Sequence, residues 1–322
     1  MPNVMNAPYP TSDNRTAIAD FAELECLARV DRQVSLMDIT RILYREADRL
    51  HEDTVREQAR AAFDELVDRV KHCGFGGKGY PFKINARGTS IELKSRRSVK
   101  RPPELYIYLL LATRLNMKSE RNQDGEDGAA LFELLCKEIA ANYWGGPTES
   151  VSSMVFGTAR AIDLPDEGEL DRTEFENAVN ALCRQIGEGY RFQADTTSRV
   201  RAKDGKLDIV VCKNFADARA GKLIGFGQCK TGTHWERDLH KLQPRDFCMK
   251  WLLKSPVVDP VRMYFVTDRL PKDDWYDRSR DGGLLFDRCR IIEYSDPVEK
   301  PLMASLRKWV KAAAKAKGLQ LP

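Results

Sequence analysis

Apolar residues recur at three- and four-residue steps through residues 16–72, which is the spacing of one face of a helix. We therefore predict that this stretch is helical. The glycine-rich segment 73–79 ends the pattern and predicts a turn. Residues 80–95 then alternate in the manner of a β-hairpin, with Arg87-Gly88 near its tip. The pattern thus predicts a helical region followed by a two-stranded ribbon.

The helical pattern resumes after the ribbon. Pro102-Pro103 opens a helix through about residue 115, and a second helix is expected at 131–143. The polar segment 122–128 between them is interpreted as a loop, and residues 1–15 as a loose, flexible tail. This half is therefore predicted to be mostly helical, and its helices and ribbon resemble a winged-helix module.

The pattern changes after about residue 165, where short strand-like runs follow one another. Thr173 and Glu176 have the spacing of a capping box and predict a helix, and Asp204-Gly205 predicts a hairpin turn. The expected strands are 190–203, 207–211, 223–230, 261–267 and 289–294. Helices are expected at 235–253, with an interruption near Pro244, and at 299–316. This order predicts an α/β domain with one mixed sheet flanked by helices.

The chain of 322 residues is long enough for about two domains. We expect a mostly helical recognition or partner-binding domain at 16–160 and the α/β domain at 165–322. Hydrophobic residues make up 42% and charged residues 31%, which excludes a disordered or fibrous chain. No apolar run approaches the ~20 residues that span a bilayer, and the first residues lack the features of a secretory signal. We therefore expect a cytoplasmic protein without a membrane partner.

Eight cysteines are scattered along the chain without a CxxC pair. In a cytoplasmic protein, this pattern predicts reduced thiols in the core. The nearest candidate for a zinc site is Cys229 with His234 and His240. Its spacing matches no zinc module and a fourth ligand is missing, so it is set aside.

One segment carries candidate chemistry, because polar residues stand at the ends of two neighbouring apolar runs. Asp208 opens the run Ile-Val-Val, and Gln228-Cys229-Lys230 closes the run Ile-Gly-Phe-Gly. Side chains alternate along a strand, so Gln228 and Lys230 are expected on one side of the sheet and Cys229 on the other. In the expected register, Asp208 faces Gln228 and Lys230.

These residue types suit the hydrolysis of a phosphodiester. Mg²⁺ (or Mn²⁺) prefers oxygen ligands, which the Asp208 carboxylate and the Gln228 carbonyl supply, and the ion activates water. Lys230 beside the ion orients the water or stabilises developing negative charge. Glu176, on the preceding helix, has the order and spacing of a further carboxylate ligand. A structural role stays open for each residue, above all for Glu176 as a plain capping residue.

In this order, Glu176, Asp208 and Gln228-x-Lys230 resemble the PD-(D/E)XK nuclease superfamily. They are most similar to its Mrr-like restriction endonuclease group, in which Gln often replaces the second acid. The resemblance covers roughly residues 170–295. It implies a restriction-endonuclease-like fold in which Asp208, Gln228 and Glu176 surround a metal and Lys230 is the catalytic lysine. Leu207 departs from the family's Pro, and Gln228 removes a negative charge, which leaves open a core that does not cleave.

Two other motifs are weaker. Glu92-Leu93-Lys94 also has E-x-K spacing, but no acid lies between Asp68 and Glu92 to serve a preceding strand. The segment 74–79 lacks the GK[ST] of a phosphate-binding loop and follows a helix rather than a strand, so a plain turn is preferred.

The resemblance implies a Mg²⁺-dependent endodeoxyribonuclease that hydrolyses DNA in restriction or anti-phage defence. The alternative is a catalytically inactive nuclease-fold subunit that binds DNA or acts as a scaffold in a multi-protein defence complex. A partner such as a defence-system ATPase and a homodimer both stay open. A third interpretation, a winged-helix transcriptional regulator, predicts DNA binding without cleavage. The net charge of +4 permits nucleic acid as a partner without demanding it.

Two groups of basic residues are candidates for DNA contact. The densest cluster of the first half lies beside the ribbon and comprises Arg96, Arg97, Lys100 and Arg101, and His234 follows the candidate catalytic strand. The second group lies in the expected C-terminal helix, where a solvated surface is the preferred interpretation. It comprises Arg307, Lys308, Lys311, Lys315 and Lys317.

Overall fold

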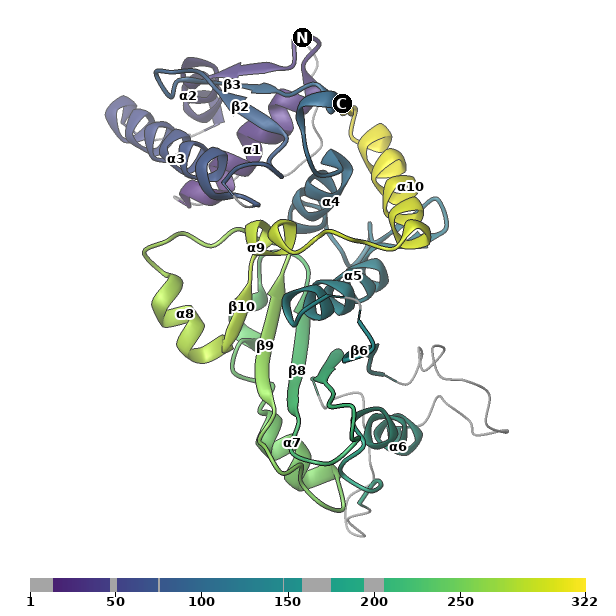
Figure 1. Cartoon of the computed structure of the whole chain (residues 1–322). Helices are drawn as coiled ribbons and strands as arrows, with labels where there is room; N and C mark the ends of the chain where they lie inside the picture. The colour runs from purple at the N-terminus through teal and green to yellow at the C-terminus, as the bar shows by residue number, and fades with distance from the viewer. Residues whose placement is uncertain (1–13, 47–50, 75, 147, 158–174, 194–205) are drawn as a thin grey trace. The chain divides into compact units, whose positions relative to one another are not determined.

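The structure is a computed structural model that describes residues 14–46, 51–74, 76–146, 148–157, 175–193 and 206–322 (Figure 1). It divides into two compact units. The first comprises Met1–Leu131, Thr267–Asp273 and Asp287–Pro322, and the second comprises Phe132–Val266 and Asp274–Phe286. The division differs from the expected boundary near residue 160, and the last helix belongs to the first unit because it packs on a helix there.

The first unit combines helices with a small antiparallel sheet of order β1-β3-β2. Its elements are α1 (Arg15–Ala28), β1 (Gln33–Ser35), α2 (Leu36–Glu46), α3 (Glu52–His72), β2 (Phe82–Ile84), β3 (Ser90–Leu93), η1 (Arg96–Ser98), α4 (Pro103–Arg114), β4 (Asn122–Gln123), β5 (Glu126–Asp127), α9 (Arg288–Glu293) and α10 (Lys300–Ala316). The hairpin expected at 80–95 is confirmed as β2 and β3. Gly88 lies in its turn with a φ of 67°, a conformation that favours glycine.

A buried ionic network lies inside the first unit. The fully buried Arg69 and Arg288 both donate to Asp20 Oδ1, at 2.6 and 2.8 Å. Arg114 donates to the other carboxylate oxygen of Asp20 at 2.7 Å, and Glu23 accepts from Arg69 at 2.8 Å. Burying charges is costly unless they are paired, and here each has a partner of opposite sign. The network therefore ties α1, α3, α4 and α9 to one another.

The second unit is built on a five-stranded mixed sheet of order β10-β9-β8-β7-β6. Its strands are β6 (Val151–Val155), β7 (Ile209–Lys213), β8 (Leu223–Lys230), β9 (Val261–Val266) and β10 (Leu284–Phe286). β6, β7 and β8 are antiparallel neighbours, whereas β8, β9 and β10 run parallel. The helices are α5 (Gly128–Tyr143), which begins in the first unit, α6 (Phe175–Ile186), η3 (Trp235–Asp238), α7 (Pro244–Trp251) and α8 (Trp275–Gly282). The fold is α/β, as expected.

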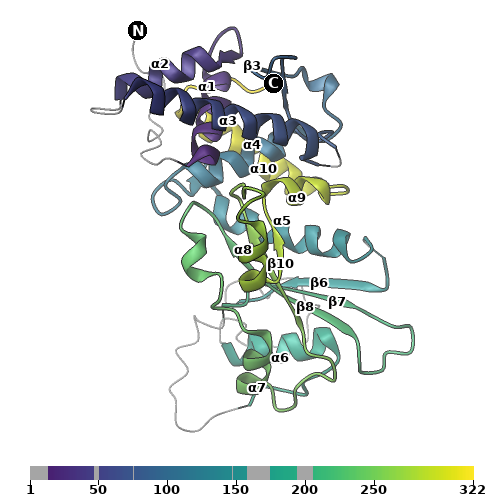
Figure 2. The ribbon, with the colours of Figure 1, turned by 90° about the vertical axis from the view of Figure 1, so that its left-hand side faces the viewer.

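Helices cover both faces of this sheet (Figure 2). On one face, Val210 and Phe226 belong to the same hydrophobic core as Leu182 of α6 and Phe247 of α7. On the other face, the end of α5 approaches β8 so closely that a methyl group on Gly225 would lie 2.8 Å from the ring of Trp144. Alternate residues of β8 therefore belong to different layers, which decides where the polar residues at its end are placed.

Three expected elements differ from the structure. Residues 289–294, expected as a strand, lie largely in α9, whose N-cap Asp287 accepts from the Arg290 N–H at 3.0 Å. The polar segment 122–128 contains the β4-β5 hairpin instead of a plain loop. β7 pairs with β8, as expected, but its other edge pairs with β6 instead of the expected strand 190–203. The expected strand 190–203 lies mostly outside the described residues, as does Thr173.

Cys73 and Cys289 form a disulfide within the first unit. The bond joins the end of α3 to α9 across a sequence separation of 216 residues. The expectation that all cysteines are reduced is therefore wrong for this pair, because folding brings together two cysteines that no sequence spacing links. The other six cysteines are free.

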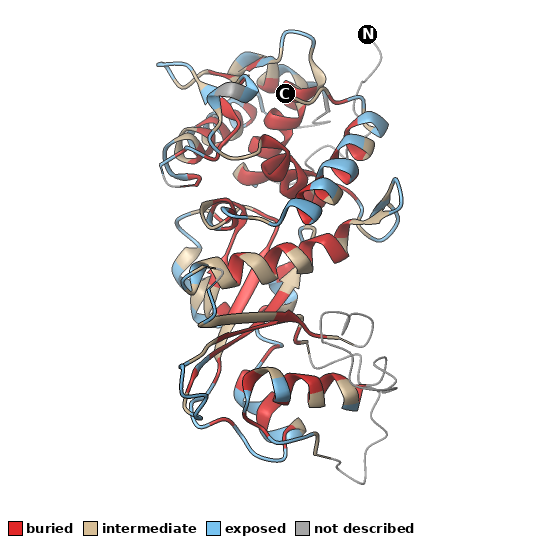
Figure 3. Cartoon of the chain, turned by 45° about the vertical axis from the view of Figure 1, so that its right-hand side comes forward, coloured by how far each residue is buried: buried red, intermediate tan, exposed pale blue. Residues whose placement is uncertain are grey.

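Burial follows the amphipathic pattern of the helices (Figure 3). In α10, the helix expected at 299–316, Leu306, Trp309 and Val310 are fully buried while the opposite side is exposed. Among the described helices, none is both long enough and apolar enough to cross a membrane.

Candidate functional site

The ends of β7 and β8 bring Asp208 beside the Gln228-Cys229-Lys230 segment. Ile209 of β7 is paired with Gly227 of the antiparallel strand β8. Asp208, just before Ile209, therefore lies opposite Gln228, just after Gly227. The Asp208 N–H donates to the Gly227 carbonyl at 2.9 Å. In addition, the Asp208 carboxylate accepts from the Cys229 N–H at 2.7 Å. The second of these bonds fixes the carboxylate against the β8 backbone one residue before Lys230.

Asp208 carries a perturbed carboxyl group. Burial raises its pKa to about 6, although the Cys229 N–H and the charges of Lys230 and Lys206 act in the opposite direction. The desolvated carboxylate is therefore under-compensated by its surroundings. A positive ion beside it would relieve that cost.

Gln228 is the most unusual residue of the site. Its side chain is fully buried, and neither its Oε1 nor its Nε2 has a hydrogen-bond partner among the described residues. Such a group costs about 1–3 kcal/mol relative to a satisfied one. Phe226, two residues earlier on the same strand, packs in the core with α6 and α7, so Gln228 lies on that face of the sheet. Its neighbour across the parallel pair is Tyr264.

Lys230 is held by an acid that follows it in the chain. Its Nζ lies 3.0 Å from the Oδ2 of Asp238, in η3, and Asp238 also pairs with Lys241. The Tyr264 hydroxyl donates to the Trp235 carbonyl at 2.9 Å and so anchors the start of η3 to β9. Asp238 of η3 therefore holds the ammonium group of Lys230, and Tyr264 of β9 holds η3 in place.

Sequence reasoning missed Asp238 and Tyr264. Asp238 belongs to no motif, and Tyr264 stands in an apolar strand where it is naturally interpreted as core. The one usable signal was the alternation of side chains along the strand. It places Tyr264 on the same side of β9 as Arg262 and Val266. That signal becomes informative only when the β8–β9 register is known.

Glu176 is not brought into this cluster. It is exposed in the first turn of α6, and no hydrogen bond or ion pair in the described chain joins it to Asp208, Gln228 or Lys230. The two regions are linked indirectly. The Phe175 ring lies 6.0 Å from the Phe156 ring, and the Phe156 N–H donates to the Asp208 carbonyl at 2.7 Å.

The donor set fits a divalent cation in part. The described residues contain no group of three or more His, Cys, Asp and Glu side chains that could hold a metal ion. The cluster instead offers one carboxylate, from Asp208, and one buried amide oxygen without a partner, from Gln228. Mg²⁺ accepts this kind of site because it keeps several of its waters.

The remaining candidate residues are exposed or have partners of their own. His234 is exposed at the start of η3, while Trp235 is buried, as a structural residue would be. In the basic cluster beside the ribbon, Arg96 pairs with Glu104 at 3.0 Å and Arg101 pairs with Asp296. Lys100 is exposed. The positive charge of that cluster is therefore partly neutralised.

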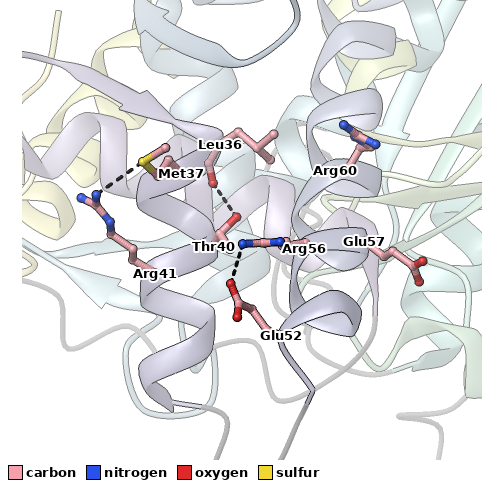
Figure 4. Close-up of a pocket in the computed structure, with 8 residues that line it drawn as sticks. All are labelled: Leu36, Met37, Thr40, Arg41, Glu52, Arg56, Glu57 and Arg60. Carbon is pink, nitrogen blue, oxygen red and sulfur yellow. Dashed lines mark hydrogen bonds and ion pairs between the residues drawn. The ribbon is translucent and has the colours of Figure 1, made fainter.

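A surface pocket of about 510 Å³ lies between α2 and α3 in the first unit (Figure 4). Leu36 and Met37 are among its apolar residues, and its basic side chains are Arg41, Arg56 and Arg60. Arg56 donates to Glu52 at 2.5 Å within the pocket. No pattern along the chain predicted this pocket, because its residues come from two helices.

Comparisons of the chain with protein-family models, curated proteins and solved structures found no match.

Proposed function

We propose that the protein is a metal-dependent nuclease that hydrolyses DNA phosphodiester bonds, with its active site at the ends of β7 and β8. One observation carries the proposal: the buried amide of Gln228 lacks a partner in the described chain and stands next to an under-compensated carboxylate and a fixed lysine. Buried polar groups are normally satisfied, so an exception of this kind points to a missing ligand. An ion bound by oxygen atoms would satisfy both side chains.

The roles follow from the chemistry of each group. Asp208 and Gln228 would hold Mg²⁺ or Mn²⁺, which neutralises phosphate charge and lowers the pKa of water. Lys230 would stabilise the negative charge that develops on the phosphate, and its ion pair with Asp238 keeps the ammonium at the strand end. Glu176 stays a candidate for contact through water or substrate, because it has no direct contact with the cluster.

The arrangement of the second unit supports a restriction-endonuclease-like fold. Three antiparallel strands followed by a parallel fourth, with helices on both faces, agree with the core implied by the resemblance. The strand beside β7 is β6, which precedes α6 in the chain, whereas the sequence predicted a strand that follows α6. Asp208 directly precedes β7, and Gln228-x-Lys230 closes β8, the central strand.

The first unit supports a role in DNA recognition. The element order α1-β1-α2-α3-β2-β3 and the sheet order β1-β3-β2 are those of a winged-helix module. The α2–α3 pocket offers Arg41 and Arg60 where such a module contacts DNA, while Glu52 and Glu57 also line it and Arg56 pairs with Glu52. For such a nuclease, we propose a role in restriction or anti-phage defence in the cytoplasm, together with a partner protein such as an ATPase.

A catalytically inactive nuclease-fold subunit is the second candidate. Two observations favour it. Gln228 is neutral where an acid would bind a metal more tightly, and the exposed Glu176 has no direct contact with Asp208, Gln228 or Lys230 in the described chain. Such a protein would bind DNA and need no metal.

A cleavage assay separates the two. Full-length protein is incubated with plasmid and linear duplex in Mg²⁺, in Mn²⁺ and in EDTA. We expect metal-dependent cleavage that Lys230→Ala abolishes. Lys213→Ala, at the opposite end of β7, serves as the matched control and should cleave like the wild type. Cleavage by a folded Lys230→Ala protein would refute the assigned site, and binding without cleavage in any metal would favour the inactive subunit.

A further inference from the structure

The outer side of α10 carries a row of basic side chains that the proposed active site does not use. Its exposed charged residues are Lys300, Arg307, Lys308, Lys311 and Lys315. The chain contains no acid from Lys300 to its end. Lys300, Arg307, Lys311 and Lys315 follow one another at steps of seven, four and four residues, and Lys308 is adjacent to Arg307. At these steps they lie along one side of the helix over about 22 Å. Figure 3 shows this exposed side opposite the buried one.

Helix stability does not explain the row. Cations near a helix C-terminus are favoured by the macrodipole, which accounts for Lys311 and Lys315 at most. Lys300 stands in the first turn, where a positive charge is disfavoured, and that turn has no acid. Among the described residues, Arg307 and Lys308 form only long ion pairs of 3.5 Å, with Glu104 and Glu126 respectively. Lys300, Lys311 and Lys315 have no ion pair within the described chain.

The row is mounted on a rigid support. The Trp309 ring is fully buried beneath it and meets the Tyr108 ring edge-on at 5.3 Å. The Trp309 Nε1 donates to the Arg121 carbonyl at 2.8 Å. Beyond the helix, the Gln320 N–H donates to the Leu27 carbonyl at 2.7 Å. The charges are therefore held in place before any partner binds.

The chemistry of this surface selects an extended polyanion. Its length exceeds any single small anion. A membrane partner would require an apolar face to insert, but the apolar face of α10 is buried in the first unit. A protein interface is normally anchored by large apolar or aromatic side chains, and the exposed ones among the described residues all lie outside α10. A phosphate backbone needs only regularly spaced cations.

We propose that the outer side of α10 binds the phosphate backbone of nucleic acid, as a sequence-independent surface separate from the active site. The charge on α3 agrees with this assignment. Its exposed residues include four acids, Glu52, Asp53, Glu57 and Asp64, against three bases, Arg56, Arg60 and Lys71. Non-specific affinity therefore resides in α10 rather than in α3. The inference does not depend on cleavage, since it concerns binding alone.

The test measures binding of a short fluorescent DNA duplex of random sequence to the full chain in EDTA, where the proposed cleavage cannot occur. The variant Lys300→Gln/Lys311→Gln/Lys315→Gln removes three cations from the row. The slope of log K against log salt is negative, and each lost phosphate contact reduces its magnitude by about 0.9. We therefore expect the magnitude of the slope to decrease by about 2 to 3, measured between about 50 and 200 mM salt.

Three further proteins make the result decisive. Lys78→Gln/Lys250→Gln/Lys272→Gln removes the same net charge from exposed lysines elsewhere and should keep the wild-type slope. Replacing the three α10 lysines by arginine should also keep it, and this variant retains the charge if the glutamine variant fails to fold. Equal losses in the two glutamine variants would overturn the proposal. So would tighter binding of poly-glutamate than of the duplex by the wild type, which would indicate an acidic protein as the partner.

Discussion

The Nζ atom of Lys230 lies 3.0 Å from the Oδ2 atom of Asp238, across the turn that follows β8. The other carboxylate oxygen of Asp238 pairs with Lys241. Hydrogen bonds from Lys241 and then from Lys230 hold the pKa of Asp238 below its usual range, against the effect of burial. Asp238 therefore stays ionised and restrains the lysine at the strand end.

Asp238→Asn should weaken cleavage without abolishing it. The amide can accept a hydrogen bond from Lys230 but no longer pairs with its charge, so the ammonium is held less firmly. Misplacement of a catalytic group by about 1 Å costs about 100-fold in rate, and we expect a loss of roughly 10- to 100-fold in single-turnover cleavage. Duplex binding in EDTA should not change, because Asp238 is a positioning residue.

Lys241→Ala is the matched control for this prediction. It removes the second partner of Asp238 and leaves the Lys230–Asp238 pair intact, so cleavage should stay near the wild-type rate. If Lys241→Ala lost as much activity as Asp238→Asn, the effect would come from the turn as a whole rather than from Lys230.

Gln228→Met should stabilise the metal-free protein and inactivate it. The replacement has similar volume and removes a buried amide that has no partner in the described chain. We expect the free energy of unfolding in EDTA to rise by about 1–3 kcal/mol. Cleavage should be lost, because no oxygen ligand remains at this position. Gln228→Glu restores a charged ligand and should cleave at lower metal concentration than the wild type.

Urea unfolding in EDTA and metal titrations of cleavage check both variants. Gln243→Met, which changes an exposed glutamine of the same unit, should leave stability within about 0.5 kcal/mol. A Gln228→Met protein that is less stable than the wild type would show that the amide is satisfied in solution and would remove the observation on which the proposed function rests.

The sequence was sufficient for the parts of this site that lie along single strands. The alternation of side chains in an apolar run predicted that Gln228 and Lys230 share one side of the sheet. The predicted bounds of β8 and β9 agree with the structure to within one residue. The site residues that come from other elements could not be predicted. Asp238 and Tyr264 join the cluster only through the β8–β9 pairing and the fold of η3, neither of which has a local signal.

Competing local preferences explain the errors elsewhere. Ile291 and Ile292 favour a strand by propensity, but the Asp287 cap and the buried packing of both side chains make this segment helical. Contacts between residues far apart in the sequence could not be predicted either, because no local pattern marks them. Such contacts place β6 beside β7 and bring Cys73 to Cys289.

Asp208→Asn should stabilise the metal-free protein in a pH-dependent way. Burial raises the pKa of Asp208 to about 6, above its value in an unfolded chain. Below about pH 4 the carboxyl is protonated in both states and costs nothing, whereas above pH 6 it is ionised in both and the cost is complete. Stability is therefore lost as the pH rises from about 4 to 6. The difference between a pKa of about 4 in the unfolded chain and about 6 in the folded protein corresponds to roughly 3 kcal/mol.

The asparagine cannot ionise, and its carbonyl oxygen can still accept from the Cys229 N–H. We expect Asp208→Asn to exceed the wild type by roughly 3 kcal/mol at pH 7.5 and to equal it near pH 4 in urea unfolding with EDTA. Asp217→Asn, an exposed aspartate after β7, should show no such trend. A stability difference that is independent of pH would contradict the raised pKa.

Asp20→Asn should destabilise the first unit, with the opposite dependence on pH. Burial alone would raise the pKa of Asp20, but the charges of Arg114, Arg288 and Arg69 outweigh it and hold the pKa far below its usual range. The carboxylate therefore contributes stability that is complete above about pH 4 and is lost as the pH falls further. Removing it leaves three guanidinium groups without this partner, which costs about 3–5 kcal/mol at pH 7.

Urea unfolding of the wild type and the variant between pH 7 and pH 2 tests the prediction. The gap between them should be widest at neutral pH and should narrow below about pH 4, because the unfolded wild type then takes up a proton at Asp20 while the folded state resists it. Asp64→Asn, an exposed aspartate on α3, is the control and should stay within about 0.5 kcal/mol of the wild type at pH 7. Since Asp20 contacts arginines of α3, α4 and α9, a gap that stayed constant in acid would mean that these guanidinium groups are compensated by Glu23 and Glu65 rather than by Asp20.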